Sequence, residues 1–293
     1  MSVTPHEEKG NRMTKYRTVE VDGADVFYRE GGERGTPALL MLHGFPSSSA
    51  QYQSLMTRLE DRYHVVAPDY PGFGQSPPLE GATSFDRLAE AIEGFTDGIG
   101  LERFSLYMFD FGAPVGFRLA TRHPERVETL VLQNGNAYEE GLGPGMQTLK
   151  PYWEDRAANE ATVRGFLQLD ATRSQYVGGV ADATTVNPDL WELDQRYLEL
   201  PGRDQVMLDL FYDYRNNVKL YPRWQEYLRA NRPPALLPWG QNDQFFPPDG
   251  ARAYLRDLPD AELHFLDTGH FATATHHAEI AELIADFLDR YVT

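Results

Sequence analysis

Three ionisable residues stand where the sequence predicts that strands end. Asp110 follows an apolar run in LYMFDFGAPVGF, and a glycine-containing helix start comes directly after it. Asp243 follows ALLPW, and His270 follows HFLD. A carboxylate buried at a strand end is unfavourable unless it is paired or used. Ligands bind outside the carboxyl ends of parallel strands, so these three side chains are candidates for one active site.

Strand-like and helix-like segments alternate over most of the chain. Strands are predicted over residues 37–42, 64–68, 104–109, 129–133, 235–239 and 262–266, of which 37–42 and 64–68 are expected to be buried. Helical patterns cover residues 51–61, 85–98, 112–123, 249–258 and 278–291. Two β-rich runs, 16–21 and 24–29, flank Asp22-Gly23 and predict a hairpin. This alternation predicts an α/β fold with a mostly parallel sheet flanked by helices.

The alternation stops between about residues 138 and 227. Aromatic, acidic, proline and glycine residues mix there with helix-like pieces at 159–169 and 204–214. A segment of this length is within the usual size range of a small domain. We therefore expect a sheet domain in two parts, with a mostly helical cap inserted after the sixth strand. The expected bounds are 1–136 for the first part of the core, 137–227 for the cap and 228–293 for the second part.

Composition excludes several classes of function. The 293 residues contain no cysteine, which rules out disulfides, thiolate metal sites and a cysteine nucleophile. A net charge of −17 disfavours binding to nucleic acids and anionic lipid. No apolar run is long enough to span a membrane, and the first residues lack the layout of a signal peptide. We expect a cytoplasmic protein without nucleic-acid or membrane partners. The spacing of its eight histidines suggests no metal site, and we expect no cofactor.

The order of nucleophile, acid and histidine, as Asp110, Asp243 and His270, resembles that of the α/β-hydrolase superfamily. The resemblance covers nearly the whole sheet portion. An aspartate as nucleophile narrows it to the branch of epoxide hydrolases and haloalkane dehalogenases. HGFP at 43–46 resembles the HGxP loop of that branch, and PDYPGFGQS at 68–76 resembles its next conserved turn. One position departs from the pattern, because Met108 stands where the family commonly has glycine.

The resemblance implies a mechanism with an ester intermediate. A carboxylate is already ionised at pH 7 and needs no base, and its attack on an sp³ carbon gives an alkyl ester of Asp110. His270, oriented by Asp243, would then take a proton from the water that hydrolyses the ester. The family's oxyanion-hole positions fall on the backbone N–H groups of Phe45 and Phe111.

Two residues need a choice between roles, the acid of the triad and His43. Some relatives place the acid after the sixth strand, where this chain offers Asn134, Asn136 and, as the only nearby acid, Glu139. His43 has the position of a structural residue of its loop rather than that of a proton carrier.

The identity of the leaving group depends on hydrogen-bond donors. Haloalkane dehalogenases usually hold the halide with a tryptophan directly after the nucleophile, and fluoroacetate dehalogenases place arginine there. This chain has Phe111 at that position and Phe45 in the HGxP loop, and neither side chain can donate. Epoxide hydrolases instead supply two cap tyrosines. FYDYRNN resembles the segment of the second, which gives Tyr214, and PYWED loosely resembles that of the first, which gives Tyr152. The substitutes are Tyr138, Tyr176 and Tyr212.

These observations favour a cofactor-independent hydrolase that opens an apolar epoxide to a vicinal diol. The expected partners are a small apolar substrate and water. The residues expected to bind the substrate are Phe45, Phe111, Trp153, Phe245 and Phe246. Two alternatives stay open: a dehalogenase with an atypical halide site that uses Trp153 or Asn134, and a ligand-binding protein that kept the fold and lost turnover. The sequence also leaves open whether the chain is a monomer or a homodimer.

Overall fold

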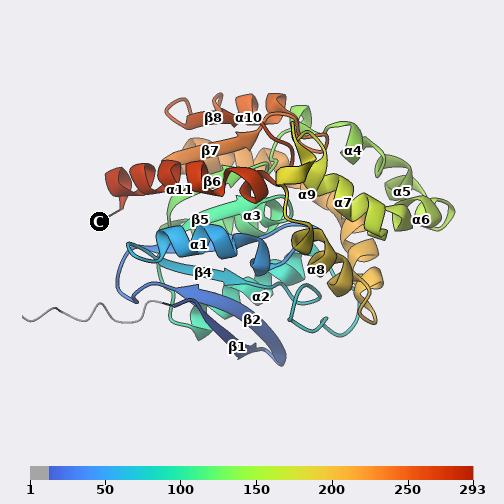
Figure 1. Cartoon of the computed structure of the whole chain (residues 1–293), viewed down its shortest axis with the longest axis horizontal. Coiled ribbons are helices and arrows are strands. Elements are labelled where there is room, and N and C mark those ends of the chain that lie inside the picture. The colour runs from blue at the N-terminus through green and yellow to red at the C-terminus, as the bar shows by residue number, and fades with distance from the viewer. Residues whose placement is uncertain (1–12, 293) are drawn as a thin grey trace, which may run out of the picture.

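An eight-stranded sheet lies at the centre of the computed structural model, which describes residues 13–292 (Figure 1). The strands are β1 (Lys15–Val21), β2 (Ala24–Gly31), β3 (Ala38–Leu42), β4 (His64–Pro68), β5 (Phe104–Phe109), β6 (Val127–Gln133), β7 (Ala235–Gly240) and β8 (Glu262–Leu266). Their order in the sheet is β1-β2-β4-β3-β5-β6-β7-β8. Strands β3 to β8 pair in parallel, and β2 pairs antiparallel with both β1 and β4. The predicted hairpin and mostly parallel sheet are therefore confirmed.

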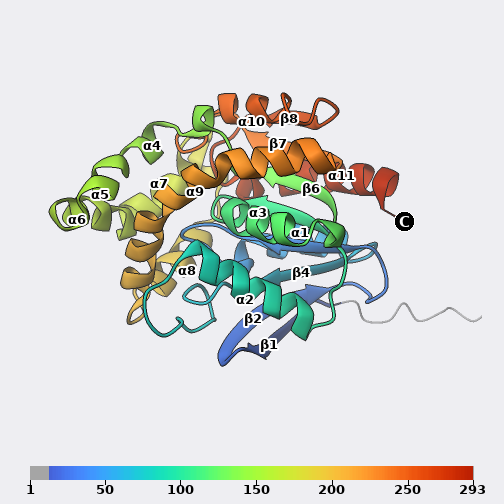
Figure 2. The same cartoon turned by 180° about the vertical axis from the view of Figure 1, so that it is seen from behind.

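Helices cover both faces of this sheet. On one face α1 (Gln53–Leu59) packs beside α11 (Ala272–Tyr291), and the short turn η1 (Ser49–Tyr52) precedes α1 (Figure 1). On the other face lie α2 (Phe85–Gly98) and α3 (Gly112–Arg122), which is followed by η2 (Pro124–Arg126) (Figure 2). Helix α10 (Pro248–Tyr254) contacts β7 and β8. The core consequently has two apolar layers, one on each face. This double coverage explains why β3, β4 and β5 are buried at every position.

A long helical segment connects β6 to β7. It contains η3 (Glu139–Gly141), α4 (Pro144–Gln147), α5 (Lys150–Glu154), α6 (Arg156–Arg164), η4 (Gly165–Leu167), α7 (Leu169–Val177), η5 (Ala183–Thr185), α8 (Pro188–Leu198) and α9 (Arg203–Asn231). Helices α4 to α8 gather beyond one end of the strands (Figures 1 and 2). Helix α9 is far longer than the piece at 204–214 predicted from the sequence, and it contacts both α2 and α3. No helix between residues 13 and 292 has the length and apolar character needed to cross a membrane.

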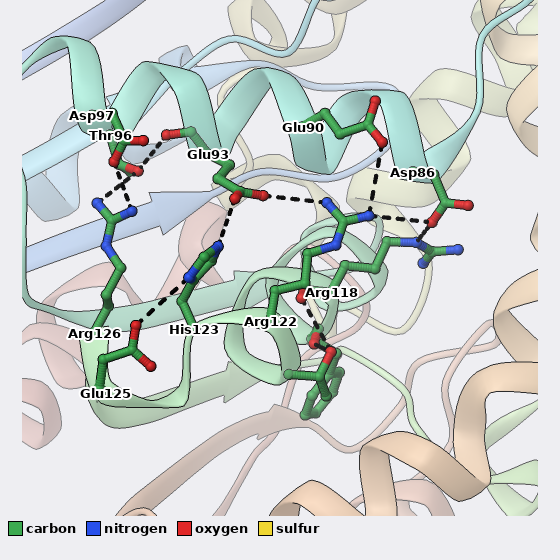
Figure 3. A network of polar contacts seen from close by, with 12 residues as sticks. Asp86, Glu90, Glu93, Thr96, Asp97, Arg118, Arg122, His123, Glu125 and Arg126 are labelled. Atoms are coloured by element: carbon green, nitrogen blue, oxygen red, sulfur yellow. Dashed lines mark hydrogen bonds and ion pairs between the residues drawn. The ribbon is translucent and has the colours of Figure 1, made fainter.

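Polar contacts fix α3 against its neighbours. The buried guanidinium of Arg118 donates to Asp86 of α2 at 2.6 Å and to Asn217 of α9 at 2.8 Å. Further along the same pair of helices, Glu93 lies 2.5 Å from His123 (Figure 3). Exposed ion pairs add little stability individually, whereas a buried guanidinium needs its partners in place. These contacts hold the middle and the end of α3, the helix that begins two residues after Asp110.

Candidate active site

Asp110 lies in a sharp turn between β5 and α3. Its backbone has φ of +49°, in the left-handed region that side-chain-bearing residues seldom adopt. Its Oδ1 accepts a hydrogen bond of 2.6 Å from the backbone N–H of Phe45. The turn leaves no space for a side chain at Gly112, because a Cβ there would lie 2.2 Å from the carbonyl oxygen of Leu42. This tight turn sets the carboxylate of Asp110 against the HGFP loop.

Met108 is accommodated by a glycine on the facing helix. Its side chain is fully buried beside Gly116 of α3, where an added Cβ would lie 2.3 Å from the Met108 sulfur. Where the family commonly has glycine in the strand, the larger side chain of Met108 fits because Gly116 on the helix has no side chain. The turn at Asp110 forms with methionine at this position.

The structure brings Asp110, Asp243 and His270 together. His270 Nδ1 lies 2.7 Å from Asp243 Oδ2, and His270 Nε2 lies 3.6 Å from Asp110 Oδ2. The other oxygen of Asp243 accepts a hydrogen bond of 2.7 Å from the backbone N–H of Phe245. The distance to Asp110 is longer than a hydrogen bond, but it places the imidazole directly beside the carboxylate.

His270 is buried between two carboxylates. Burial lowers the pKa of its imidazole, but Asp243 and Asp110 outweigh that effect through charge and hydrogen bonding and raise the pKa to about 9. At neutral pH the ring is therefore an imidazolium. It is surrounded by aromatic rings, with the ring centroid of Phe109 at 4.7 Å and that of Phe245 at 5.2 Å.

His43, by contrast, is occupied by the backbone. Its Nδ1 lies 3.0 Å from the carbonyl oxygen of Gly44, and the backbone N–H of Tyr70 donates to its Nε2 at 3.2 Å. Burial also lowers the pKa of His43, which keeps the ring neutral. These contacts agree with a structural residue of the loop.

The side-chain amides of Gln133 and Asn134, at the end of β6, support the site. The sequence analysis did not predict this role for them. Asn134 Nδ2 donates to Asp243 Oδ2 at 2.8 Å, and Asn134 Oδ1 accepts from the backbone N–H of Gly240 at 2.9 Å. Gln133 Nε2 donates to the carbonyl oxygen of His270 at 3.2 Å. The feature of the sequence that could have indicated this role is a pair of amide residues, Gln133 and Asn134, where a mostly apolar strand ends.

A narrow cavity of about 30 Å³ lies at Asp110. Three of the predicted substrate-binding residues, Phe45, Phe111 and Phe245, line it. The remainder of the wall comes from the inserted helical segment: Gly145, Met146, Leu149, Phe166, Gln175 and Phe211. These residues were not predicted, because nothing in a stretch of many apolar residues marks which of them face a cavity.

The other two predicted substrate-binding residues lie outside the wall. Trp153 Nε1 donates to the carbonyl oxygen of Phe211 at 2.8 Å. The ring of Phe246 is fully buried, with its centroid 5.8 Å from that of His270. Neither side chain is among those that line the cavity.

Neither of the predicted cap tyrosines lines the cavity. Tyr152 donates from its hydroxyl to the carbonyl oxygen of Leu208 at 3.2 Å. Tyr214 is fully buried, with its ring centroid 6.2 Å from that of Phe111 and its hydroxyl 3.5 Å from that of Tyr221. Burial raises the pKa of Tyr214, so its O–H keeps its proton at neutral pH.

The three substitute tyrosines have other contacts. Tyr138 donates to Asp257, Tyr176 donates to Asp194, and the ring of Tyr212 packs against the guanidinium of Arg215.

Comparisons with known proteins agree with this architecture. The family model described as alpha/beta hydrolase fold matches residues 37–276. The chain is 41% identical to the uncharacterized hydrolase YNR064C of Saccharomyces cerevisiae (strain ATCC 204508 / S288c), over 94% of this chain and 97% of the relative. It is 30% identical to a 2-hydroxymuconate semialdehyde hydrolase of Pseudomonas putida, over 87% of each chain. The structure of a putative ancestral haloalkane dehalogenase, AncHLD2, superposes with a TM-score of 0.78 at 21% identity, over 94% of this chain and 99% of that one. At that identity the likeness shows the fold alone.

Proposed function

This chain belongs to the alpha/beta hydrolase fold family, and on that premise we propose that it opens an apolar epoxide to a vicinal diol through an ester on Asp110. One observation carries the proposal. The nucleophile position holds a carboxylate that lies 3.6 Å from His270 Nε2, and the carboxylates of Asp243 and Asp110 raise the pKa of that imidazole to about 9 against the effect of burial. A serine in this position would need a neutral histidine as its base, whereas a carboxylate needs none.

The first step forms the ester. An Asp110 oxygen attacks a ring carbon, the new C–O bond forms while the ring C–O bond breaks, and the electron pair stays on the ring oxygen as an alkoxide. The alkoxide takes a proton from the hydroxyl of Tyr214. Through exchange with solvent, Tyr214 regains a proton and His270 gives one up, so the imidazole becomes neutral.

The same step prepares His270 as a base. Once Asp110 is an uncharged ester, its contribution to the raised pKa of His270 is lost, and that pKa falls. The neutral imidazole takes a proton from water, and the hydroxide adds to the ester carbonyl. The oxyanion is bound by the N–H groups of Phe45 and Phe111. When the tetrahedral intermediate collapses, the proton of its hydroxyl group passes to the leaving diol oxygen, which restores the Asp110 carboxylate and leaves His270 as the imidazolium.

The cavity wall lacks the indole N–H with which haloalkane dehalogenases usually hold the halide, which favours an epoxide. No tryptophan is among the lining residues. The indole N–H groups of Trp153 and Trp239 both donate to backbone carbonyl oxygens, so neither is free to hold a halide. The apolar wall fits an apolar substrate.

Tyr214 is better placed than Tyr152 to protonate the alkoxide. Its hydroxyl has a second tyrosine hydroxyl as its partner rather than a backbone carbonyl, and its ring lies against that of Phe111, which lines the cavity. The proposal requires the ring of Phe111 to turn aside when substrate enters.

A trapped intermediate tests the proposal. The wild-type enzyme is incubated with styrene oxide and, separately, with short 1-bromoalkanes, and diol and bromide are measured. In the His270→Gln variant, intact-protein mass spectrometry should show one added styrene oxide, and peptide mapping should place it on Asp110. The isosteric Asp110→Asn variant is the control and should show neither adduct nor diol. Bromide release without diol, or ligand binding without turnover of any substrate, would contradict epoxide opening.

A further inference from the structure

A polar side chain of the inserted helices reaches the cavity without a partner. Gln175 of α7 lines the cavity together with Asp110, and the other lining side chains are apolar. It is 5% exposed, and its amide forms no hydrogen bond with any residue in the part of the chain that the structure describes. The polar atoms of Gln175 are not among the buried unpartnered atoms of the described residues, so its amide borders open space and is available to hydrogen-bond a group that enters the cavity.

Helix α7, which carries Gln175, is fixed against the loop of His270. The ring of Tyr176 stacks on that of Phe271, directly after His270, with centroids 3.9 Å apart. The end of the helix touches the same loop so closely that a Cβ on Gly269 would lie 1.8 Å from the carbonyl oxygen of Gly178. The backbone at Gln175 is therefore coupled to the loop that carries His270.

We propose that the side-chain amide of Gln175 donates a hydrogen bond to the ring oxygen of the epoxide and strengthens it as that oxygen becomes an alkoxide. This inference rests on the proposed function. In an in-line displacement the breaking C–O bond points away from the attacking Asp110 oxygen, toward the wall made by the inserted helices. Gln175 is the hydrogen-bond donor among the side chains of that wall.

Gln175 keeps its own protons during the step. The alkoxide is protonated by Tyr214 as described above, while Gln175 stabilises the developing negative charge. The residue would therefore contact the substrate and act on ester formation, and it would have no part in ester hydrolysis.

The first test compares rates of ester formation. In the His270→Gln background, addition of Gln175→Leu should slow the appearance of the styrene oxide adduct on Asp110 by roughly 10- to 100-fold, the range for a hydrogen bond to a charged group. The matched control is Ser174→Ala, at the exposed neighbouring position on α7, which should leave the rate unchanged. Equal rates with and without Gln175 would overturn the inference, whereas no adduct in His270→Gln alone would overturn the proposed function.

The second test separates a contact with substrate from a structural role. The Asp110→Asn variant, which is expected to bind substrate without turnover, is titrated with styrene oxide and with cyclopropylbenzene, which has the same shape but no oxygen. We expect tighter binding of the epoxide by roughly 2- to 10-fold. Adding Gln175→Leu should abolish this preference. If it weakens both ligands equally, Gln175 is a structural residue and the inference fails.

Discussion

The side-chain amide of Asn134 donates a hydrogen bond of 2.8 Å to Asp243, on the same carboxylate oxygen that lies 2.7 Å from His270 Nδ1. The acid at the end of β7 is thus supported from the end of β6. That is the strand end at which some relatives of the resembled branch carry the acid itself. The two strand ends are close enough for one to supply the carboxylate and the other the amide that orients it.

This contact predicts that the two roles can be exchanged. Asp243→Asn should slow hydrolysis of the Asp110 ester by about 10³-fold or more, because His270 loses the charge that stabilises its imidazolium. The double variant Asn134→Asp, Asp243→Asn keeps one carboxylate and one amide at these positions and should recover part of that loss. Single-turnover decay of the ester measures both effects. A double variant no faster than Asp243→Asn alone would show that only the β7 position can serve.

Tyr214 and Tyr152 should respond differently to loss of the hydroxyl. Tyr214→Phe removes the proposed acid and should slow formation of the Asp110 ester by about 10²-fold. Tyr152→Phe is the matched control, because its hydroxyl donates to the Leu208 carbonyl oxygen, and it should change the rate by no more than about 3-fold. Steady-state kcat/KM with styrene oxide reports this step. Equal effects of the two substitutions would argue against Tyr214 as the acid.

The pKa of His270 should depend on the charge of Asp110. In the free enzyme the two carboxylates raise this pKa to about 9 against the effect of burial. Asp110→Asn, an uncharged mimic of the ester, removes one of them and should lower the pKa. The imidazole resonances of His270, followed by NMR against pH, would show the change directly. An unchanged pKa in the variant would mean that ester formation does not prepare His270 as a base.

Met108 and Gly116 should be energetically coupled. Gly116→Ala places a methyl group against the Met108 sulfur and should destabilise the protein by about 1–3 kcal/mol. Met108→Ala should also destabilise it, by about 2–4 kcal/mol, through a buried cavity. The double variant should be more stable than the sum of the single effects predicts, since each substitution relieves the other. Urea denaturation measures all three, and simple additivity would mean that the two side chains do not share this space.

Asp194 should make stability depend on pH. Burial raises the pKa of this carboxyl to about 7, although the hydrogen bond from Tyr176 opposes the shift. Between about pH 4 and 7 the carboxyl of Asp194 is protonated in the folded protein and ionised in the unfolded chain. The free energy of unfolding should therefore fall as pH rises through that window. The fall should be on the order of 2–4 kcal/mol.

Two variants isolate this contribution to stability. Asp194→Asn should flatten the dependence between pH 4 and 7, and Glu192→Gln, at an exposed position on the same helix, should leave it unchanged. Urea denaturation at pH 5 and pH 8 is the measurement. An equal pH slope in wild type and Asp194→Asn would place the titrating group elsewhere.

The sequence by itself determined the sheet and the meeting of three side chains. Central strands buried on both faces are mostly apolar, so β4 and β5 were predicted with the bounds that the structure has. The bounds of β8, a half-buried edge strand, were also predicted. Parallel strands end at a common edge, which is why Asp110, Asp243 and His270 could be expected together from their strand ends alone. Their roles in catalysis stay a prediction.

Only the tertiary structure decided what surrounds these three residues. Gln175 and Trp153 are both polar-tipped residues of the inserted segment, but Gln175 lines the cavity while the indole N–H of Trp153 is taken by a backbone carbonyl. Which way a side chain points depends on how short helices pack against one another, and no periodicity in the sequence records that packing. The contact of Asn134 with Asp243 could not be predicted for the same reason: the two residues are more than a hundred positions apart in the sequence.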